Sequence, residues 1–194
     1  MRLLLIMFLV TFTYMSSPSA AILSMSGNFK TDDDVQLFNV TVNTPGIITF
    51  RTTSNAVGGF DPMLALFDGT GNWIDFSDDD PLLAGGGDSR IETNLVAGSY
   101  TVAISQFGNF NLGVLGDGFV KTGQTNYTSI QGCSNGIFCN ASGDNRLAAW
   151  AIEVVGASGL ERISGDISAV PLPAALPLFG VGLLAFGIIS RRRK

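Results

Sequence analysis

Aspartates form the densest group of residues in this sequence that could bind a ligand. Asp75, Asp78, Asp79 and Asp80 fall within six positions, and a second run covers residues 32–34. Carboxylate oxygens suit Ca²⁺, which takes six to eight oxygen ligands. Adjacent carboxylates also repel one another, and a bound divalent ion would relieve that repulsion. The sequence predicts a calcium site in the 75–80 loop, with solvated turn aspartates as the alternative.

Cys133 and Cys139 are the only cysteines, with five residues between them. In an exported chain, such a pair favours a disulfide that closes a small loop. Zinc would need two further soft ligands, and the sequence contains no histidine. The spacing also differs from the Cys-x-x-Cys of thioredoxin-like redox sites. We therefore expect a structural disulfide.

Residues 132–136 read Gly-Cys-Ser-Asn-Gly and match the Gly-x-Ser-x-Gly pattern of a hydrolase nucleophile. That pattern has catalytic meaning on the strand–turn–helix of an α/β sheet, with a histidine base. Here histidine is missing, and the expected disulfide brackets the serine. A secreted hydrolase is the least favoured function, and the chain is predicted not to be an enzyme.

Aromatic rings are a further source of binding chemistry, because exposed rings stack on sugars. Trp73 lies in a polar turn-to-strand setting and is the candidate for a surface position. Trp150 and Tyr100 are expected in the core, the usual place for large rings in a small β-domain. Trp73 together with the Asp75–Asp80 loop would make a calcium-dependent carbohydrate-binding module, which is the alternative function.

The segment that must position these residues, 22–169, has the pattern of one all-β domain. Short runs rich in Val, Ile, Thr and Phe are separated by Gly, Asp and Asn clusters. The expected strands cover residues 35–42, 47–53, 63–67, 73–76, 90–95, 99–106 and 147–155. A turn at 43–46 makes the second the return strand of the first, and 108–143 is expected to hold long loops with one or two irregular strands. About seven short strands favour a β-sandwich with jelly-roll topology.

The N-terminus has the features of an export signal. Met1-Arg2 is a short basic start, residues 3–14 are an apolar core, and small residues follow, ending in Ser19-Ala20-Ala21. This pattern predicts a secretory signal peptide over residues 1–21, cleaved after Ala20 or Ala21. The implied partners are Sec-type export machinery and signal peptidase.

The C-terminal segment, 170–194, has the features of a membrane sorting tail. It begins with Val170, Pro171, Leu172, Pro173 and Ala174, stays uncharged to Ile189, and ends in Arg191, Arg192, Arg193 and Lys194. The apolar stretch is slightly under the ~20 residues that cross the hydrocarbon core, and the basic end would stay cytoplasmic. The prolines keep the preceding segment extended and open to a protease. A transmembrane sorting helix is predicted, with an uncleaved tail anchor as the alternative.

This tail resembles the PEP-CTERM class of bacterial sorting signals, in its Val-Pro-Leu-Pro-Ala variant. The resemblance implies an exosortase-type membrane protease that cuts near the proline motif. It implies the inner membrane as the site of sorting, and the cell surface, outer envelope or extracellular matrix as the destination. Because that system is associated with bacteria that make exopolysaccharide, it further implies a structural or binding role in the envelope or in an exopolysaccharide (biofilm) matrix.

The central region resembles the bacterial pre-peptidase C-terminal domain, over roughly residues 34–107. The residues that carry the resemblance are Phe-Asp-Pro-Met-Leu-Ala-Leu-Phe-Asp-Gly-Thr-Gly-Asn at 60–72, the acids at 78–80, and Ala-Gly-Ser-Tyr-Thr-Val at 97–102. Members of that family use loop carboxylates for calcium, so the resemblance also implies calcium as the one cofactor to consider.

The charge of the exported part limits its partners. Of 11 basic residues, Arg2 and the last four lie in the two ends, which leaves six against 16 acidic residues and a net charge of about −10. A domain this acidic is not expected to bind nucleic acid or anionic lipid. The sequence leaves the ligand, the oligomeric state and the fate of the tail open.

Overall fold

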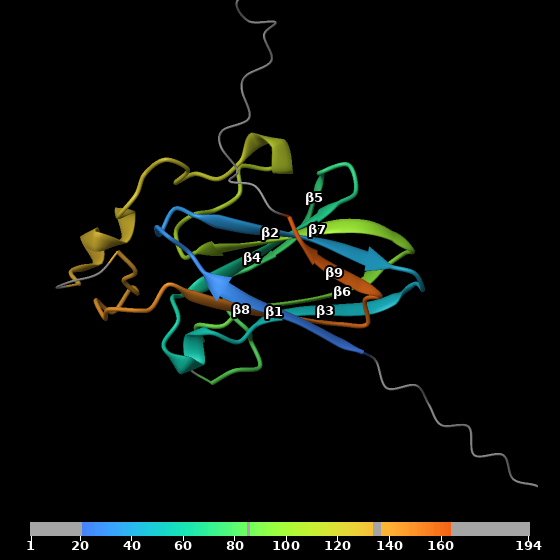
Figure 1. Ribbon diagram of the computed structural model, residues 1–194, viewed down its shortest axis with the longest axis horizontal. Coiled ribbons are helices and arrows are strands. Elements are labelled where there is room, and N and C mark those ends of the chain that lie inside the picture. Colours follow the sequence, from blue (N-terminus) through green and yellow to red (C-terminus); the bar gives the residue numbers. More distant parts are fainter. Residues whose placement is uncertain (1–20, 85, 134–136, 164–194) are drawn as a thin grey trace, which may run out of the picture.

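Two antiparallel sheets packed face to face make up the fold in this computed structural model, which describes residues 21–84, 86–133 and 137–163 (Figure 1). The four-stranded sheet has the order β1-β8-β3-β6, and the five-stranded sheet has the order β5-β4-β7-β2-β9. The strands of the first sheet are β1 (Ile22–Asn28), β8 (Ala149–Val155), β3 (Gly46–Thr52) and β6 (Arg90–Leu95). Those of the second are β5 (Trp73–Ser77), β4 (Pro62–Asp68), β7 (Gly98–Gln106), β2 (Val35–Val42) and β9 (Gly159–Arg162).

The strand pairing is that of a jelly-roll, as predicted. β1 pairs with β8, β2 with β7, β3 with β6 and β4 with β5, which is one long hairpin rolled up on itself. The short strand β9 is added beside β2 at the edge of the second sheet. Because β9 runs antiparallel to β2, the described chain ends near Val35, at the opposite pole from Ile22.

The strands expected from the sequence are present within one or two residues of their predicted bounds. One connection differs: β2 and β3 lie in different sheets, so the turn at 43–46 crosses between the sheets and closes no hairpin. Both strands point apolar residues into the same core from opposite sides. The burial of these residues outweighs the preference of the turn residues at 43–46 for a tight hairpin. Strands β1 and β9 were not expected.

The main core lies between the two sheets. Along the strands, apolar residues that point into this core alternate with residues that point outward. Trp150 is 1% exposed and packs its ring edge-on against Phe38, with ring centroids 5.4 Å apart. Tyr100 is buried too, and its hydroxyl donates to the carbonyl of Val96. The prediction of both rings in the core is confirmed.

A second, smaller core covers the outer face of the five-stranded sheet. Ala65, Phe67, Ala103 and Phe119 form it, and Phe119 comes from the long segment after β7. In its described residues this segment contains the short 3-10 helices η2 (Leu115–Asp117) and η3 (Tyr127–Gln131). The irregular strands expected between 108 and 143 appear there only as isolated bridges, such as Asn111 with Phe119.

The predicted signal peptide, except Ala21, and the predicted sorting tail lie outside the described residues. Within the part of the chain that the structure describes, no helix combines the length and hydropathy required to cross a bilayer.

Candidate functional site

The four predicted calcium ligands lie along β5 and the loop that follows it. Three of them each accept a hydrogen bond from a backbone amide: Asp75 from Phe76 (2.8 Å), Asp79 from Gly87 (2.6 Å) and Asp80 from Leu82 (2.9 Å). These bonds order the turns around β5. Among residues 21–84, 86–133 and 137–163, no three Asp, Glu or Cys side chains are arranged to hold a metal ion. The oxygen donors suit Ca²⁺, yet they do not form a preformed site, and the calcium site stays a prediction.

Carboxylates do gather at one pole of the sandwich, where β4 begins. Burial, together with the charges of Asp78, Asp79 and Asp88, raises the pKa of Asp61 to about 6, against an opposing effect of Arg146. Burial and the charge of Asp79 also raise the pKa of Asp78. We call Asp61, Asp78, Asp79 and Asp88 the acidic pole. It differs from the predicted set, because Asp75 and Asp80 are replaced by Asp61 and Asp88.

Two of the four carboxylates at the acidic pole are poorly compensated. Asp88 accepts hydrogen bonds from the Thr52 hydroxyl (2.9 Å) and from two backbone amides of the 3-10 helix η1 (Asn55–Val57). By contrast, Oδ1 of Asp78 is buried and has no hydrogen-bond partner among the described residues. The Arg146 guanidinium donates to the backbone carbonyls of Gly59 and Asn55. Asp61 and Asp78 are therefore the carboxylates whose negative charge would be offset by protonation or by a bound cation.

Replacing Asp61 with asparagine is expected to stabilise the protein at pH 7 and to have little effect at pH 4. The folded-state pKa of about 6 lies above the unfolded value of 3.8, so the native state is penalised as pH rises between the two. With allowance for solvent screening of a half-buried carboxyl, we expect a gain of about 1–2 kcal/mol at pH 7. Thermal unfolding from pH 4 to pH 7.5 measures it. An equal effect at both ends of that range would contradict the assignment.

The second acidic run, residues 32–34, anchors the long segment after β7. Asp32 is fully buried, and its carboxylate accepts hydrogen bonds from the amides of Asn126 (2.6 Å) and Thr128 (2.8 Å) and from the Thr128 hydroxyl (2.7 Å). Asp33 accepts from the amide of Gly123, and Asp34 accepts from the amides of Lys30 and Thr31 within its own turn. This run therefore has a structural role in the fold.

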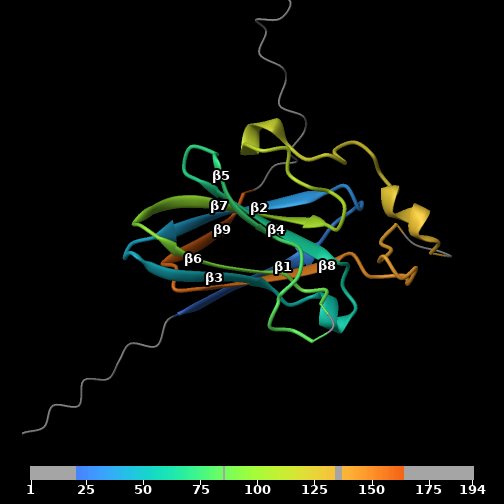
Figure 2. The same cartoon turned by 180° about the vertical axis from the view of Figure 1, so that it is seen from behind.

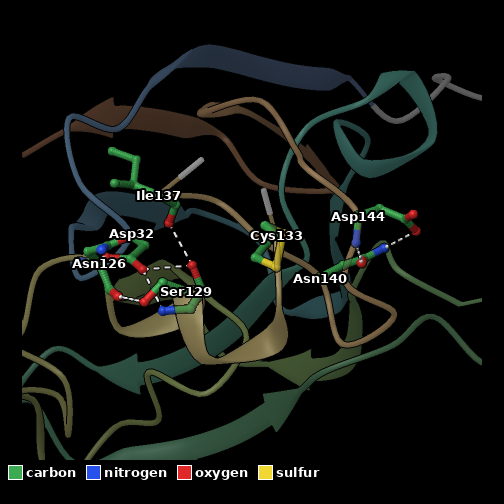
Figure 3. The surroundings of a disulfide bond; sticks show 9 residues. Asp32, Asn126, Ser129, Cys133, Ile137, Asn140 and Asp144 are labelled. Carbon is green, nitrogen blue, oxygen red and sulfur yellow. Dashed lines mark hydrogen bonds between the residues drawn. A yellow bond between two sulfur atoms is a disulfide. The ribbon is translucent and has the colours of Figure 1, made fainter. Parts of the chain in front are cut away.

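The disulfide between Cys133 and Cys139 is present, as predicted (Figure 3). Beside it, the Thr128 hydroxyl lies within hydrogen-bond distance of both the Ile137 carbonyl (2.6 Å) and the Asp32 carboxylate (2.7 Å). Its one hydrogen is shared between these two acceptors, which links the disulfide loop to Asp32. Phe138 is buried and stacks on Phe60, with ring centroids 5.5 Å apart. The bond thus fixes a loop that contributes to the main core. Residues 134–136 of the hydrolase-like pattern lie outside the described residues.

Trp73 is 55% exposed, as predicted, and lies on edge strand β5. Its Cα partner across the sheet is Phe67, so its ring is on the outer face of the sheet. The indole N–H donates to the carbonyl of Asp75 (3.0 Å), which fixes the ring. Asp78 and Asp79 follow the far end of β5, roughly 15 Å away along a strand of this length. The structure does not bring Trp73 and the acidic pole into one site.

The turn before Trp73 is held rigid by Asp68. Its carboxylate accepts hydrogen bonds from the side chains and amides of Thr70 and Asn72. These bonds hold the pKa of Asp68 well below its usual range, with Thr70 the largest cause.

Sequence reasoning missed Asp61, Asp88 and the exposed ring of Phe110. Asp88 lies in the same β5–β6 loop as Asp78, whereas Asp61 comes from the loop before β4 and approaches them only through packing. Phe110 lies in a weakly patterned segment. The one local feature that could have drawn attention to Asp61 is the Asp-Pro step at 61–62, directly before a buried strand.

Comparison with known proteins decides the role of the C-terminus. Residues 169–194 match the family model of the PEP-CTERM protein-sorting motif. The chain carries a PEP-CTERM sorting signal. This signal marks an exported protein that an exosortase processes and sorts through the membrane to the cell surface. The prediction made from the proline motif and the basic tail is confirmed.

The fold has a similar solved structure, the 1.0 Å crystal structure of the pre-peptidase C-terminal domain of collagenase from Bacillus anthracis. The TM-score is 0.36 at 10% identity, over 68% of this chain and 85% of that one. The likeness concerns the arrangement of strands alone. A search of curated proteins finds no match.

Proposed function

We propose that the mature protein is a non-catalytic structural or binding domain of the cell envelope or of an exopolysaccharide matrix. The observation that carries this proposal is the PEP-CTERM signal at 169–194, which delivers the domain to the surface. The last strand, β9, ends at Arg162, and five residues separate the last described residue, Ile163, from the start of that signal. The absence of histidine from the sequence supports a role without acid–base catalysis at a Ser-His site.

Replacing both Pro171 and Pro173 with alanine in the producing organism tests this proposal. We expect the wild-type protein at the cell surface or in the matrix fraction, and the double variant retained in the inner membrane with its tail. The helix-breaking prolines keep the cleavage region extended, and alanine removes that constraint. Pro177→Ala, beyond the Val-Pro-Leu-Pro-Ala motif, is the control. If the double variant fractionates like the wild type, the proline motif does not direct sorting.

Calcium-dependent carbohydrate binding is the second candidate. It is favoured by the uncompensated Asp61 and Asp78 at the acidic pole, where a divalent ion would offset the repulsion. Trp73 lies at the other end of β5 from the acidic pole. A Ca²⁺ ion bound there would therefore raise the stability of the fold and would not lie beside Trp73. The test is the melting temperature of the mature protein in millimolar Ca²⁺ and in chelator. An unchanged value would remove calcium from the account.

A further inference from the structure

Aromatic rings line the outer rim of the five-stranded sheet beside β5. Trp73 and Phe76 share this face, because they pair across the sheet with Phe67 and Ala65 of the second core. Phe110, from the segment after β7, lies 5.8 Å from Phe76 between ring centroids and 6.3 Å from Phe107. Trp73 is 55% exposed and Phe110 is 44% exposed. We call Trp73, Phe76 and Phe110 the aromatic strip.

Backbone hydrogen bonds hold the strip in place from both sides. The amide of Leu115 donates to the carbonyl of Gly71 (2.8 Å), which ties the segment after β7 to the β4–β5 turn. The amide of Val120 donates to the carbonyl of Phe110 (2.9 Å). In Figures 1 and 2 this segment stands beside the β5 hairpin in both views. The exposed rings therefore belong to ordered backbone.

We propose that the aromatic strip binds a neutral polysaccharide chain. The proposal rests on the matrix role proposed above and names the ligand of that role. Ring faces stack on the apolar faces of sugars, and Trp73 is 55% exposed while its N–H is already satisfied within the protein. Because the rings are already held in position, little conformational entropy is lost on binding.

Charge selects a neutral chain over an anionic one. The polar residues that adjoin the strip in the sequence are Asn72, next to Trp73, and Asn111, next to Phe110, and both are neutral amides. The arginines of the domain make contacts elsewhere: Arg51 with Glu153, Arg90 with Glu92, Arg146 with the carbonyls of Asn55 and Gly59, and Arg162 with Gln36 and Trp150. A domain of net charge about −10 repels a uronate-rich polymer. Sugar hydroxyls can both donate to and accept from the groups present.

Affinity electrophoresis of the mature protein tests the proposal, with hydroxyethyl cellulose, galactomannan and dextran as neutral probes and alginate as the anionic probe. We expect retardation by at least one neutral probe, unchanged by chelator. Trp73→Ala and Phe110→Ala should each weaken it by about tenfold, the scale for loss of one aromatic anchor. Ile130→Ala removes an 85% exposed side chain from the same segment and should change nothing.

Tryptophan fluorescence gives an independent measurement. The sequence has two tryptophans, and Trp150 is buried, so the neutral polysaccharide should change the emission of Trp73 alone. Trp73→Phe keeps a ring and should keep part of the affinity while losing the fluorescence change. The proposal would be overturned if no neutral probe retards the protein, or if alginate retards it more than the neutral probes do. It would also be overturned if Trp73→Ala and Ile130→Ala reduce the affinity equally. A protein that reaches the surface yet fails these tests refutes the ligand and leaves the surface role standing.

Discussion

Replacing Asp32 with alanine is expected to lower the free energy of unfolding by about 3–5 kcal/mol. The fully buried carboxylate accepts three hydrogen bonds from Asn126 and Thr128, and its removal leaves two backbone amides without their partner, while the Thr128 hydroxyl keeps the carbonyl of Ile137. Each unsatisfied buried group costs about 1–3 kcal/mol. Urea unfolding measures the total. Hydrogen exchange should show the largest loss of protection at the amides of Asn126 and Thr128.

Asp117→Ala is the matched control, because Asp117 is exposed and its loss changes the net charge equally. We expect a change within about 0.5 kcal/mol for this variant. Asp32→Asn keeps the shape of the side chain and should fall between the two. If Asp32→Ala and Asp117→Ala destabilise equally, the anchoring role of Asp32 is refuted.

Adding one methyl group at Gly59 is expected to cost about 2–4 kcal/mol. A Cβ there would lie 2.5 Å from the carbonyl oxygen of Ala149 and 2.7 Å from that of Ser54, so backbone would have to move. Overpacking of this kind costs about 1–3 kcal/mol, and Gly59 also accepts a hydrogen bond from Arg146 at the acidic pole. Thermal and urea unfolding of Gly59→Ala provide the measurement.

Gly46→Ala makes the same chemical change at a position where nothing lies within 4 Å of the new Cβ. We expect it to be neutral, or slightly stabilising through the unfolded chain. A Gly59→Ala variant as stable as Gly46→Ala would show that the close approach of the 54–61 loop to β8 is not required.

The sheet strands were predictable where residues alternate with a period of two. Val35–Val42 and Gly98–Gln106 put Val, Phe, Tyr and Ile on one face, and the burial of that face fixes both strand and register. Strand β1 was missed because its outward positions are small and polar and its start adjoins the signal peptide. Strand β9 has four residues, two of them charged and exposed, so its placement comes from pairing with β2.

The candidate site residues were predictable from the sequence only where the residue type and its immediate neighbours are enough to determine the position or the pairing. Trp73 follows a polar turn, and its exposure follows from that setting. Cys133 and Cys139 are the only cysteines, so their pairing has no competitor. The acidic pole depends on the approach of Asp61, which precedes β4, to Asp78, Asp79 and Asp88 of the β5–β6 loop, and this approach is set by packing that proximity in the sequence does not indicate. Phe110 has its position only because the segment after β7 folds back on β5.

Intact mass of the mature protein recovered from producing cells shows whether the sorting tail is removed. We expect an N-terminus at Ala21 or Ile22, a C-terminus near the motif at residues 170–174, and two alkylatable thiols only after reduction. Cells that lack the exosortase should yield the form that still ends in Lys194. Surface protein that keeps residues 175–194 in normal cells would contradict removal of the tail and identify it as a permanent anchor.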